Sequence, residues 1–357
     1  MHIALTFNLK KKDDTKPADY FSEFDSAETV NAIASALKSR GHDVELVDVG
    51  EVDLFSYFKK NRIDLVFNIA EGKHGKFREA EIPAMLDYLN VPYTGSNTFS
   101  LVLALNKALT KKILKAENIP TPNFQLFVKG DEELNPELKF PLIVKPNYEG
   151  SAKGISVSNV VGTQDALFAK VKELMMTYKQ GVLVEEFIEG RELTVGVLEN
   201  GKVAILPILE IDFSSCADSG EYFYSWRMKE YQGNTSLGLV PTFYCPARLD
   251  KEVEAKVKEV ARRTHQVLGC CGISRTDIRL SKDNIPYVLE INPLPGLNPK
   301  ESNFPIMAYA AGMKYEELIE TILISASDKE LIRGHVAHVL TERITEAKVL
   351  EASERKG

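Results

Sequence analysis

Apolar and polar positions over residues 1–95 predict strands and helices in alternation. Short apolar runs typical of buried strands occupy residues 3–7, 44–49 and 65–68, and amphipathic stretches typical of helices occupy residues 26–40 and 80–89. Residues 10–24 are polar and charged, so we expect them to form a loop. Strands that alternate with helices indicate a parallel, doubly wound sheet of the α/β class.

The pattern changes after residue 95. It predicts helices at residues 100–117, 164–177 and 250–268, and strands at residues 123–128 and 142–145 and through much of 181–210. Residues 211–245 lack clear periodicity, and so long a loop in a compact domain is usually functional. Two further strands, around residues 275–280 and 287–292, are joined by a turn at residues 281–284.

Composition and charge narrow the class of protein. A hydrophobic content of 44% and a charged content of 27% describe an ordinary globular chain, and 357 residues suffice for two or three compact units. The formal net charge of −7 argues against a nucleic-acid partner. No apolar run approaches the roughly 20 residues of a membrane span, and the first residues do not read as a signal peptide. The four cysteines form no disulfide framework, so we expect a reducing compartment, the cytoplasm.

The last strand pair carries the strongest chemical signal. Asp277, Glu290 and Asn292 offer oxygen ligands of the kind that Mg²⁺ prefers. Arg275 lies two residues before Asp277, so both side chains point to one face of a strand. Carboxylates, an amide and a guanidinium would be costly to bury together in a plain core, whereas metal-bound phosphate explains them.

Two further segments are compatible with phosphate or nucleotide binding. Residues 145–154 form a loop of small residues after an apolar strand, with Lys145 and Ser151, although the P-loop pattern is absent. Residues 182–195 run from an apolar strand through Glu185 and Glu186 to Glu192. Alone, the first could be a simple turn and the second a charged hairpin tip. Lys107 and Lys229 could equally be lysines that only reach solvent.

In this order the segments resemble the ATP-grasp superfamily and, more closely, the D-alanine–D-alanine ligase family. The resemblance covers roughly residues 1–325 and is carried by residues 91–96, 106–111, 143–151, 185–195, 243–247, the set around Arg275 and Asp277, and residues 304–313. It implies an α/β fold (α+β overall) of three domains. These would be an N-terminal domain at 1–98, a central subdomain at 99–182 and a C-terminal antiparallel-sheet subdomain at 183–327. The last would carry a lid at 213–240, and residues 328–357 would form a helical appendage.

The resemblance also implies roles for individual residues. Phosphates of ATP would be held by Lys107, Lys145 and, on lid closure, Lys229; Glu185, Glu186, Phe187 and Ile188 would line the adenine, and Glu192 would bind the ribose. Two Mg²⁺ ions, for which Mn²⁺ could substitute, would be bound by Asp277, Glu290 and Asn292. Arg275 and the N–H of Gly296 would face the reacting carbonyl group.

The resemblance implies less directly which residues bind the amino-acid substrates. Glu28, supported by Ser151, would bind the ammonium of the first amino acid, and Ser302 the carboxylate of the second. Asp25 and Glu28 at a helix start also fit a capping box, so the role of Glu28 stays open. A histidine usual in the family is replaced here, with either Glu71 or His74 in its place, and Tyr231 is displaced by one residue.

The implied reaction is ATP-dependent joining of a carboxylate to an amine through an acyl phosphate, with release of ADP and phosphate. Its place would be peptidoglycan synthesis and cell wall biogenesis, and its partners ATP and small amino acids, with a homodimer formed through the N-terminal domain. Three alternatives remain at this point. They are the same chemistry on another amino acid, a hydroxy acid or a specialised metabolite; nucleotide binding without catalysis; and a biotin-dependent carboxylase, for which no biotinylation site exists.

Overall fold

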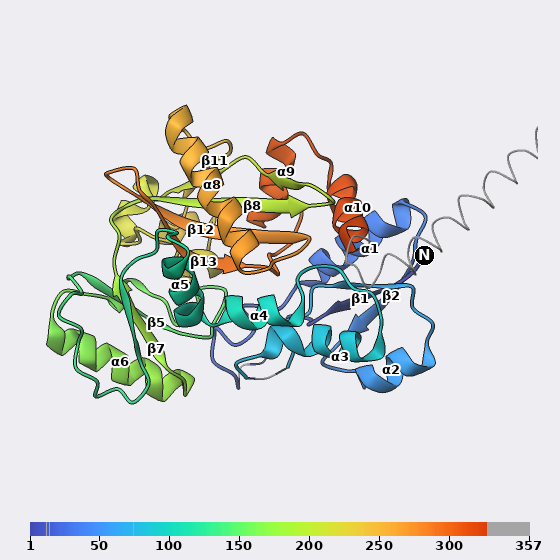
Figure 1. Cartoon of the computed structure of the whole chain (residues 1–357), viewed down its shortest axis with the longest axis horizontal. Helices are drawn as coiled ribbons and strands as arrows, with labels where there is room; N and C mark the ends of the chain where they lie inside the picture. Colours follow the sequence, from blue (N-terminus) through green and yellow to red (C-terminus); the bar gives the residue numbers. More distant parts are fainter. Residues whose placement is uncertain (12, 14, 74, 327–357) are drawn as a thin grey trace, which may run out of the picture.

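The computed structural model describes residues 1–326 except residues 12, 14 and 74, and its strands form three sheets (Figure 1). The appendage predicted at residues 328–357 lies outside the described residues. Among the helices that are described, none combines the length and the apolar character needed to cross a membrane. The predicted domain boundaries stay predictions, but each sheet has helices and a hydrophobic cluster of its own.

The N-terminal sheet is parallel, in the order β2-β1-β3, as the alternating pattern predicted. Its strands are β1 (His2–Phe7), β2 (Asp43–Asp48) and β3 (Leu65–Asn68), and its helices are α1 (Ala27–Ser39), α2 (Leu54–Lys60) and α3 (Glu81–Leu89), the last preceded by a 3-10 turn, η1 (Arg78–Ala80). One face packs on α1 and the other on α2 and α3. Strands β1 and β3 are therefore buried almost throughout, whereas the edge strand β2 combines apolar with charged residues.

The central sheet is antiparallel, in the order β4-β7-β5-β6. Its elements are β4 (Phe124–Phe127), β5 (Leu142–Pro146), β6 (Val160–Val161), β7 (Val182–Glu186), the short turn η2 (Val157–Asn159) and helix α6 (Gln164–Tyr178). Leu167, Val171 and Leu174 of α6 pack on one face of this sheet. The opposite face is left free to border a cavity.

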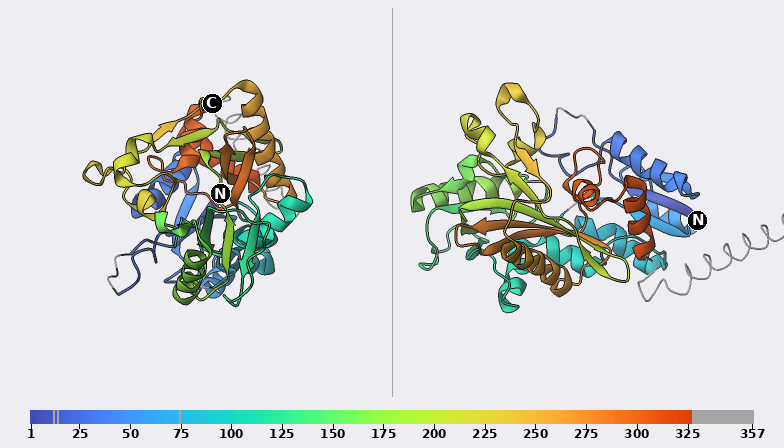
Figure 2. Two further views of the ribbon diagram at one scale, coloured as in Figure 1. Left: turned by 90° about the vertical axis from the view of Figure 1, so that its left-hand side faces the viewer. Right: turned by 90° about the horizontal axis from the view of Figure 1, so that it is seen from above.

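The C-terminal sheet is the largest, in the order β11-β10-β8-β12-β13. The short strand β9 pairs with the C-terminal end of β8. Its strands are β8 (Gly190–Glu199), β9 (Val203–Ile205), β10 (Leu209–Asp212), β11 (Thr242–Tyr244), β12 (Ile273–Ser281) and β13 (Pro286–Asn292). Helix α8 (Lys251–Val267) covers one face, and α9 (Asn303–Ala310) and α10 (Tyr315–Ser325) connect the other to the N-terminal sheet. Figure 2 shows α10 beside α1, although the two are far apart in sequence.

The single helix predicted at residues 100–117 is wrong, because the structure has two helices there. They are α4 (Thr98–Leu105) and α5 (Lys107–Ala116), separated by Asn106. Asn106 has a non-helical backbone (φ −86°, ψ 87°), and its side-chain oxygen accepts a hydrogen bond from the N–H of Leu109 (3.1 Å). An asparagine that caps a new helix competes with continuation of the old one. The break makes Lys107 the first residue of α5.

Two segments without long elements lie over the site. The N-terminal strap (residues 10–25) has no helix or strand among its described residues, as predicted. The lid segment (residues 213–240) was predicted as a loop but contains η3 (Ser214–Ser219), α7 (Trp226–Glu230) and η4 (Thr235–Leu237). A small cluster of Cys216, Met228 and Leu239 gives the lid segment a core of its own, which periodicity cannot reveal in so short a stretch.

Alanine in place of Leu37 should destabilise the protein strongly. Leu37 of α1 is 0% exposed and packs in the cluster shared with α10, so the free energy of unfolding should fall by about 2–5 kcal/mol. The matched control is Leu109→Ala on α5, where the leucine is 38% exposed and the loss should be about 1 kcal/mol or less. Thermal unfolding of both variants measures the difference. Equal losses would contradict this packing of α1 against α10.

Candidate active site

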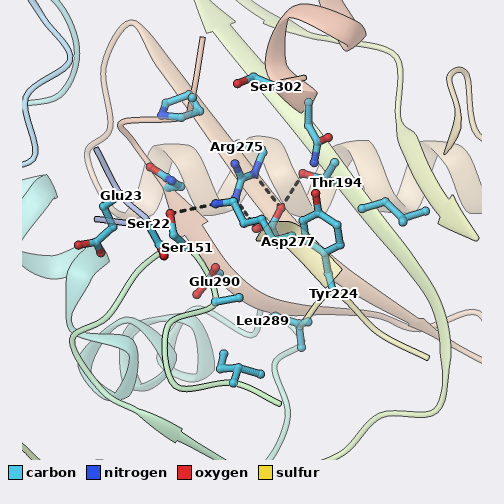
Figure 3. A pocket seen from close by; sticks show the side chains of 18 of the residues that line it. Ser22, Glu23, Ser151, Thr194, Tyr224, Arg275, Asp277, Leu289, Glu290 and Ser302 are labelled. Carbon is cyan, nitrogen blue, oxygen red and sulfur yellow. Dashed lines mark hydrogen bonds and ion pairs between the residues drawn. The ribbon is translucent and has the colours of Figure 1, made fainter. Parts of the chain in front are cut away.

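A cavity of about 450 Å³ lies where the three sheets meet. Its walls come from the strap, β5 and the loop that follows it, the β7–β8 connection, the lid segment, and the β12–β13 pair with the loop after β13 (Figure 3). Most of the site residues predicted from sequence line it: Glu71, Lys145, Ser151, Glu185, Phe187, Ile188, Glu192, Lys229, Arg275, Asp277, Glu290, Asn292, Gly296 and Ser302. Glu28, Lys107, Glu186 and Tyr231 do not line it, and His74 lies outside the described residues.

The β12–β13 pair places four of these side chains on one face. Asp277 lies opposite Glu290 and Arg275 opposite Asn292 in the antiparallel register, and directly opposed side chains share a face. Arg275 donates two hydrogen bonds to Asp277, at 2.9 Å and 2.7 Å. Thr194 of β8 donates a third, at 2.6 Å (Figure 3). The pairing therefore assembles the set expected from its spacing in sequence.

Glu290 is held as a carboxylate by Lys107. The Lys107 ammonium lies 2.9 Å from Glu290 and donates a 2.6 Å hydrogen bond to the carbonyl of Glu149. Burial alone would favour the neutral acid, but Lys107 and the nearby Lys145 lower the pKa of Glu290 to about 2. Lys107 lies behind the cavity wall and reaches the site through this carboxylate.

The donor set at this face fits a divalent cation that prefers oxygen. Asp277 and Glu290 are ionisable carboxylates, and Asn292 adds an amide oxygen that here accepts a hydrogen bond from the N–H of Leu294 (2.8 Å). Among the described residues no three His, Cys, Asp or Glu side chains form a closed metal cage. Two carboxylates and open positions suit Mg²⁺, which usually completes its shell with phosphate and water.

The role predicted for Glu185 at the adenine is not supported by its contacts. Its carboxylate, 2% exposed, pairs with the ammonium of Lys145 on one side and with that of Lys111 at 2.9 Å on the other. Burial would raise the pKa of Glu185, but the two lysines hold it below its ordinary value. Since it is used by two buried cations, Glu185 serves to orient Lys145 toward the cavity.

Glu186 points away from the cavity because neighbouring residues on a strand face opposite sides. Its carboxylate accepts hydrogen bonds from Asn123 (3.1 Å) and from the N–H of Lys139 (3.0 Å). The adenine-lining role predicted for its side chain is therefore not supported. Phe187 and Ile188, which follow it, do line the cavity.

Glu192 lies on the cavity wall beside a cation that sequence reasoning missed. The guanidinium of Arg279 donates to its carboxylate at 3.1 Å, and the N–H of Tyr224 donates at 3.3 Å. Burial raises the pKa of Glu192 despite the opposing charge of Arg279. The alternation 275, 277, 279 along β12 was the available signal, because it places Arg279 on the face that already holds the predicted metal ligands.

The phosphate loop (residues 149–154) has an unusual backbone. Ser151 and Ala152 have positive φ angles of 50° and 56°, which non-glycine residues rarely adopt. Among the described residues, none accepts a hydrogen bond from the N–H groups of these two. Free N–H groups in such a turn form an anion-binding concavity. Lys229 of the lid segment donates to the Ser151 hydroxyl at 2.9 Å, so the lid reaches this loop.

Tyr231 does not take part in that contact. It is 43% exposed, and its ring packs edge-on against Trp226 within the lid segment. The displacement of Tyr231 by one residue puts a family-like hydrogen bond between Tyr231 and Ser151 in doubt, and in this structure it is Lys229 that donates to the Ser151 hydroxyl. The extra residue between lysine and tyrosine turns the tyrosine to the outer side of α7.

The placement of Glu28 at the substrate end is corrected by the structure. Glu28 is exposed and pairs with Lys300 at 2.7 Å. The helix is capped by Ser26, whose hydroxyl accepts from the N–H of Thr29 (3.2 Å), so the capping box read from Asp25 and Glu28 is wrong by one residue. A carboxylate in the first turn of a helix suits the helix dipole, which accounts for Glu28 without a ligand.

Two other carboxyl groups border this end of the cavity, those of Asp25 and Glu71. Burial raises the pKa of Asp25 to about 7, against the opposing charge of Lys229. Burial and the neighbouring Glu79 raise the pKa of Glu71 well above its ordinary value. Asp25 was missed because it lies in a polar segment with no periodicity, where nothing in the sequence shows which side chain turns inward.

Comparison with known proteins gives one consistent result. The family model described as D-ala D-ala ligase C-terminus matches residues 113–324. A D-alanine--D-alanine ligase of Carboxydothermus hydrogenoformans is 37% identical over 84% of this chain and 92% of the relative, and one of Desulforamulus reducens is 36% identical over 82% and 90%. A crystal structure of the Bacillus anthracis D-alanine--D-alanine ligase, complexed with ATP, has a TM-score of 0.71 at 26% identity, covering 91% of this chain and 97% of that one.

The raised pKa of Asp25 should make stability depend on pH. A free aspartate ionises near pH 4, whereas folded Asp25 stays protonated up to about pH 7, so its contribution to stability falls as pH rises through this window. Asp25→Asn removes the titration, and its unfolding temperature relative to wild type should therefore rise between about pH 4 and pH 7. Asp283→Asn, at an exposed turn, is the control for loss of a charge. A difference that stays flat over this range for Asp25→Asn would contradict the burial of Asp25.

Proposed function

This chain belongs to the D-alanine–D-alanine ligase family, and from that premise we propose that it joins two molecules of D-alanine into a dipeptide while converting ATP to ADP and phosphate. The carboxylate of the first amino acid takes the γ-phosphoryl group and becomes an acyl phosphate. The amine of the second attacks the acyl carbon, and phosphate leaves. The observation that carries the proposal is a single cavity that combines a phosphate loop with Arg275, Asp277, Glu290 and Asn292.

We assign Mg²⁺ to Asp277, Glu290 and Asn292, whose oxygen atoms suit it. When bound, two such ions would neutralise the phosphates and the transferring phosphoryl group. Lys107 and Arg275 now pair with these two carboxylates, and both would turn toward phosphate and substrate oxygens. Binding of metal and ATP would therefore replace one set of charge pairs by another.

Arg275 and the N–H of Gly296 are assigned to the oxyanion that develops on the acyl carbon. Both border the cavity beside the proposed metal site. Donors aimed at the developing charge stabilise the transition state more than the ground state. Ser302, whose hydroxyl accepts from the N–H of Asn298 (3.0 Å), is assigned to the carboxylate of the second amino acid.

Asp25 and Glu71 are assigned to the ammonium of the first amino acid, in place of Glu28. Their carboxyl groups border the cavity near Ser151 and Lys229. A bound ammonium would favour their charged forms and offset the burial that raises both pKa values. The lid segment would close over the acyl phosphate and exclude water, with Lys229 turning from Ser151 to the phosphates.

The setting of the reaction is also part of the proposal. The use of ATP and four free cysteines (Cys216, Cys245, Cys270 and Cys271) favour the cytoplasm, where the dipeptide would enter peptidoglycan synthesis. A homodimer stays a prediction. The alternative substrates, another amino acid or a hydroxy acid, are not favoured, because the relatives compared are named D-alanine--D-alanine ligases.

Phosphate release from ATP and Mg²⁺, measured across D- and L-amino acids and hydroxy acids with mass spectrometry of the products, tests this function. D-Alanine should support turnover and give D-alanyl-D-alanine, while L-alanine should not. Turnover with another pair and none with D-alanine would overturn the choice of substrate but keep the chemistry. No turnover with any pair would overturn the ligase reaction itself.

Substitutions on the β12–β13 face should abolish or severely reduce turnover without unfolding the protein. Asp277→Ala and Glu290→Ala each remove a proposed metal ligand, and both should reduce kcat to near background. Arg275→Lys should reduce kcat on the order of 10²–10³-fold, because an ammonium cannot reproduce the guanidinium fork. Lys282→Ala, at an exposed pair with Glu189, is the control. Near-normal kcat in both alanine variants would remove the metal assignment.

A further inference from the structure

The strap meets the phosphate loop through one buried carboxylate. Glu23, whose side chain is 5% exposed, accepts a 2.8 Å hydrogen bond from the N–H of Gly150. The same oxygen pairs with the guanidinium of Arg78, and Lys153 lies 3.5 Å from the other oxygen. Burial would raise the pKa of Glu23, but Arg78 and Lys153 hold it below its ordinary value. Glu23 is therefore an ionised group with partners on two other segments.

Arg78 completes the connection from the N-terminal domain. It precedes α3, its side chain is 10% exposed, and it donates a 2.9 Å hydrogen bond to the carbonyl of Tyr148. It also lies 3.6 Å from the carboxylate of Glu149, which pairs with Lys153 at 2.8 Å. Two carboxylates and two cations thus balance in a buried network that joins the strap, the turn before α3 and the phosphate loop.

The position of this network matters because the phosphate loop is strained. Positive φ angles at Ser151 and Ala152 are unfavourable for residues with a Cβ, and they persist only where the surroundings hold them. The contacts of Glu23 and Arg78 fall on residues immediately before this pair, Tyr148 to Gly150, and Lys153 follows it. The network therefore borders the strained residues on both sides.

Packing at Gly150 shows how close the approach is. A Cβ atom at this position would lie 2.7 Å from the Glu23 carboxylate oxygen, closer than real side-chain contacts. The φ angle of Gly150 is not positive, so the requirement for glycine here comes from the approach of Glu23 and not from backbone conformation. A side chain at residue 150 would displace the Glu23 carboxylate from the loop.

The strap is also held by hydrogen bonds from α6 and α7. The hydroxyl of Tyr178 on α6 donates to Asp19 (2.5 Å), and the indole N–H of Trp226 on α7 donates to the Ser22 hydroxyl (2.8 Å). Asp25, two residues beyond Glu23, borders the substrate end of the cavity. One short segment thus contacts the central sheet, the lid segment, the phosphate loop and the substrate end.

We propose that Glu23 and Arg78 form a clasp, a pair of positioning residues that hold the phosphate loop in its strained, anion-binding conformation and tie it to the strap that carries Asp25. Glu23 borders the cavity and Arg78 does not line it; in this proposal both act by positioning the phosphate loop and not by contact with ATP or amino acid. The clasp presents the free N–H groups of Ser151 and Ala152 to phosphate, so its loss weakens nucleotide binding and releases phosphate without dipeptide. The proposal rests on the proposed function for its turnover readout, and nucleotide affinity tests it independently.

The principal variant is Glu23→Gln, which keeps the shape of the side chain and removes its charge. Hydrogen bonds to charged groups contribute about 1.5–3 kcal/mol, which corresponds to a rise in KM for ATP of about 10- to 100-fold. The KM for the second amino acid should stay within about twofold, because Ser302 is held by the N–H of Asn298 and not by Glu23 or Arg78. The ratio of phosphate released to dipeptide formed should increase above that of wild type.

Two further variants keep the test decisive if Glu23→Gln does not fold. Gly150→Ala disturbs the clasp from the loop side without changing any charge and should raise KM for ATP in the same way. Arg78→Lys keeps the charge but loses the planar guanidinium with its several N–H donors, and it should raise KM for ATP by an intermediate factor. The matched control is Glu51→Gln, because Glu51 pairs with Lys11 of the same strap on its exposed side. It should leave KM for ATP and the phosphate-to-dipeptide ratio unchanged.

Affinity for ADP, measured by calorimetry, distinguishes failure of the clasp from failure of the proposed ligase function. If wild type makes no dipeptide but Glu23→Gln binds ADP at least tenfold more weakly than wild type, the clasp stands and the proposed function fails. If folded Glu23→Gln and Gly150→Ala proteins, with unfolding temperatures near that of wild type, keep wild-type KM for ATP and affinity for ADP, the clasp is wrong. An equal rise in KM for ATP and for the second amino acid would also overturn it, because that pattern indicates general loosening.

Discussion

The antiparallel pairing of β12 with β13 is the constraint on which the rest of the site depends. Its register sets Asp277 against Glu290 and Arg275 against Asn292, so one sheet face carries the carboxylates and the guanidinium. A shift of one residue would turn each of these side chains into the opposite face. Strand β13 lies at the edge of the sheet, but β12 is central. Its register is fixed because β12 also pairs with β8 along nine positions and α8 packs against the far face.

Charge balance is the second theme of the site. Almost every buried carboxylate near the cavity has a cation of its own: Glu290 has Lys107, Glu185 has Lys111 and Lys145, and Glu192 has Arg279. A buried charge without a partner would be costly, so these pairs keep the site ionised and preorganised. Asp25 and Glu71 differ, because burial raises their pKa values by more than the nearby charges of Lys229 and Arg78 lower them. The incompletely compensated carboxyl groups are therefore those that border the substrate end.

The remaining walls come from segments that have little regular structure. The strap and the lid segment hold each other through Ser22 and Trp226 and through the exposed pair of Lys10 and Glu230. These contacts between the two segments are polar or charged, whereas the apolar cluster of Cys216, Met228 and Leu239 lies within the lid segment. Segments of this kind can open at low cost, which suits a site that must admit ATP and then exclude water.

Local patterns in the sequence determined much of this protein. Alternation and amphipathicity placed the parallel N-terminal sheet and most helices, and the spacing of Arg275, Asp277, Glu290 and Asn292 predicted that these side chains share one face. These features are local or lie on neighbouring strands, where the period of two fixes the side chain's face.

The break at Asn106 was missed because a cap competes with helix continuation only through its own side chain. Glu28 was predicted at a cavity that Asp25 borders instead, because a helix start does not show which carboxylate faces a distant cavity. Whether Glu185 binds a ligand or pairs with Lys111, and whether Glu23 meets Gly150, depends on segments far apart in the chain. Only tertiary structure decides such contacts, because burial and the charges of neighbouring segments determine them, and neither is present in a local pattern.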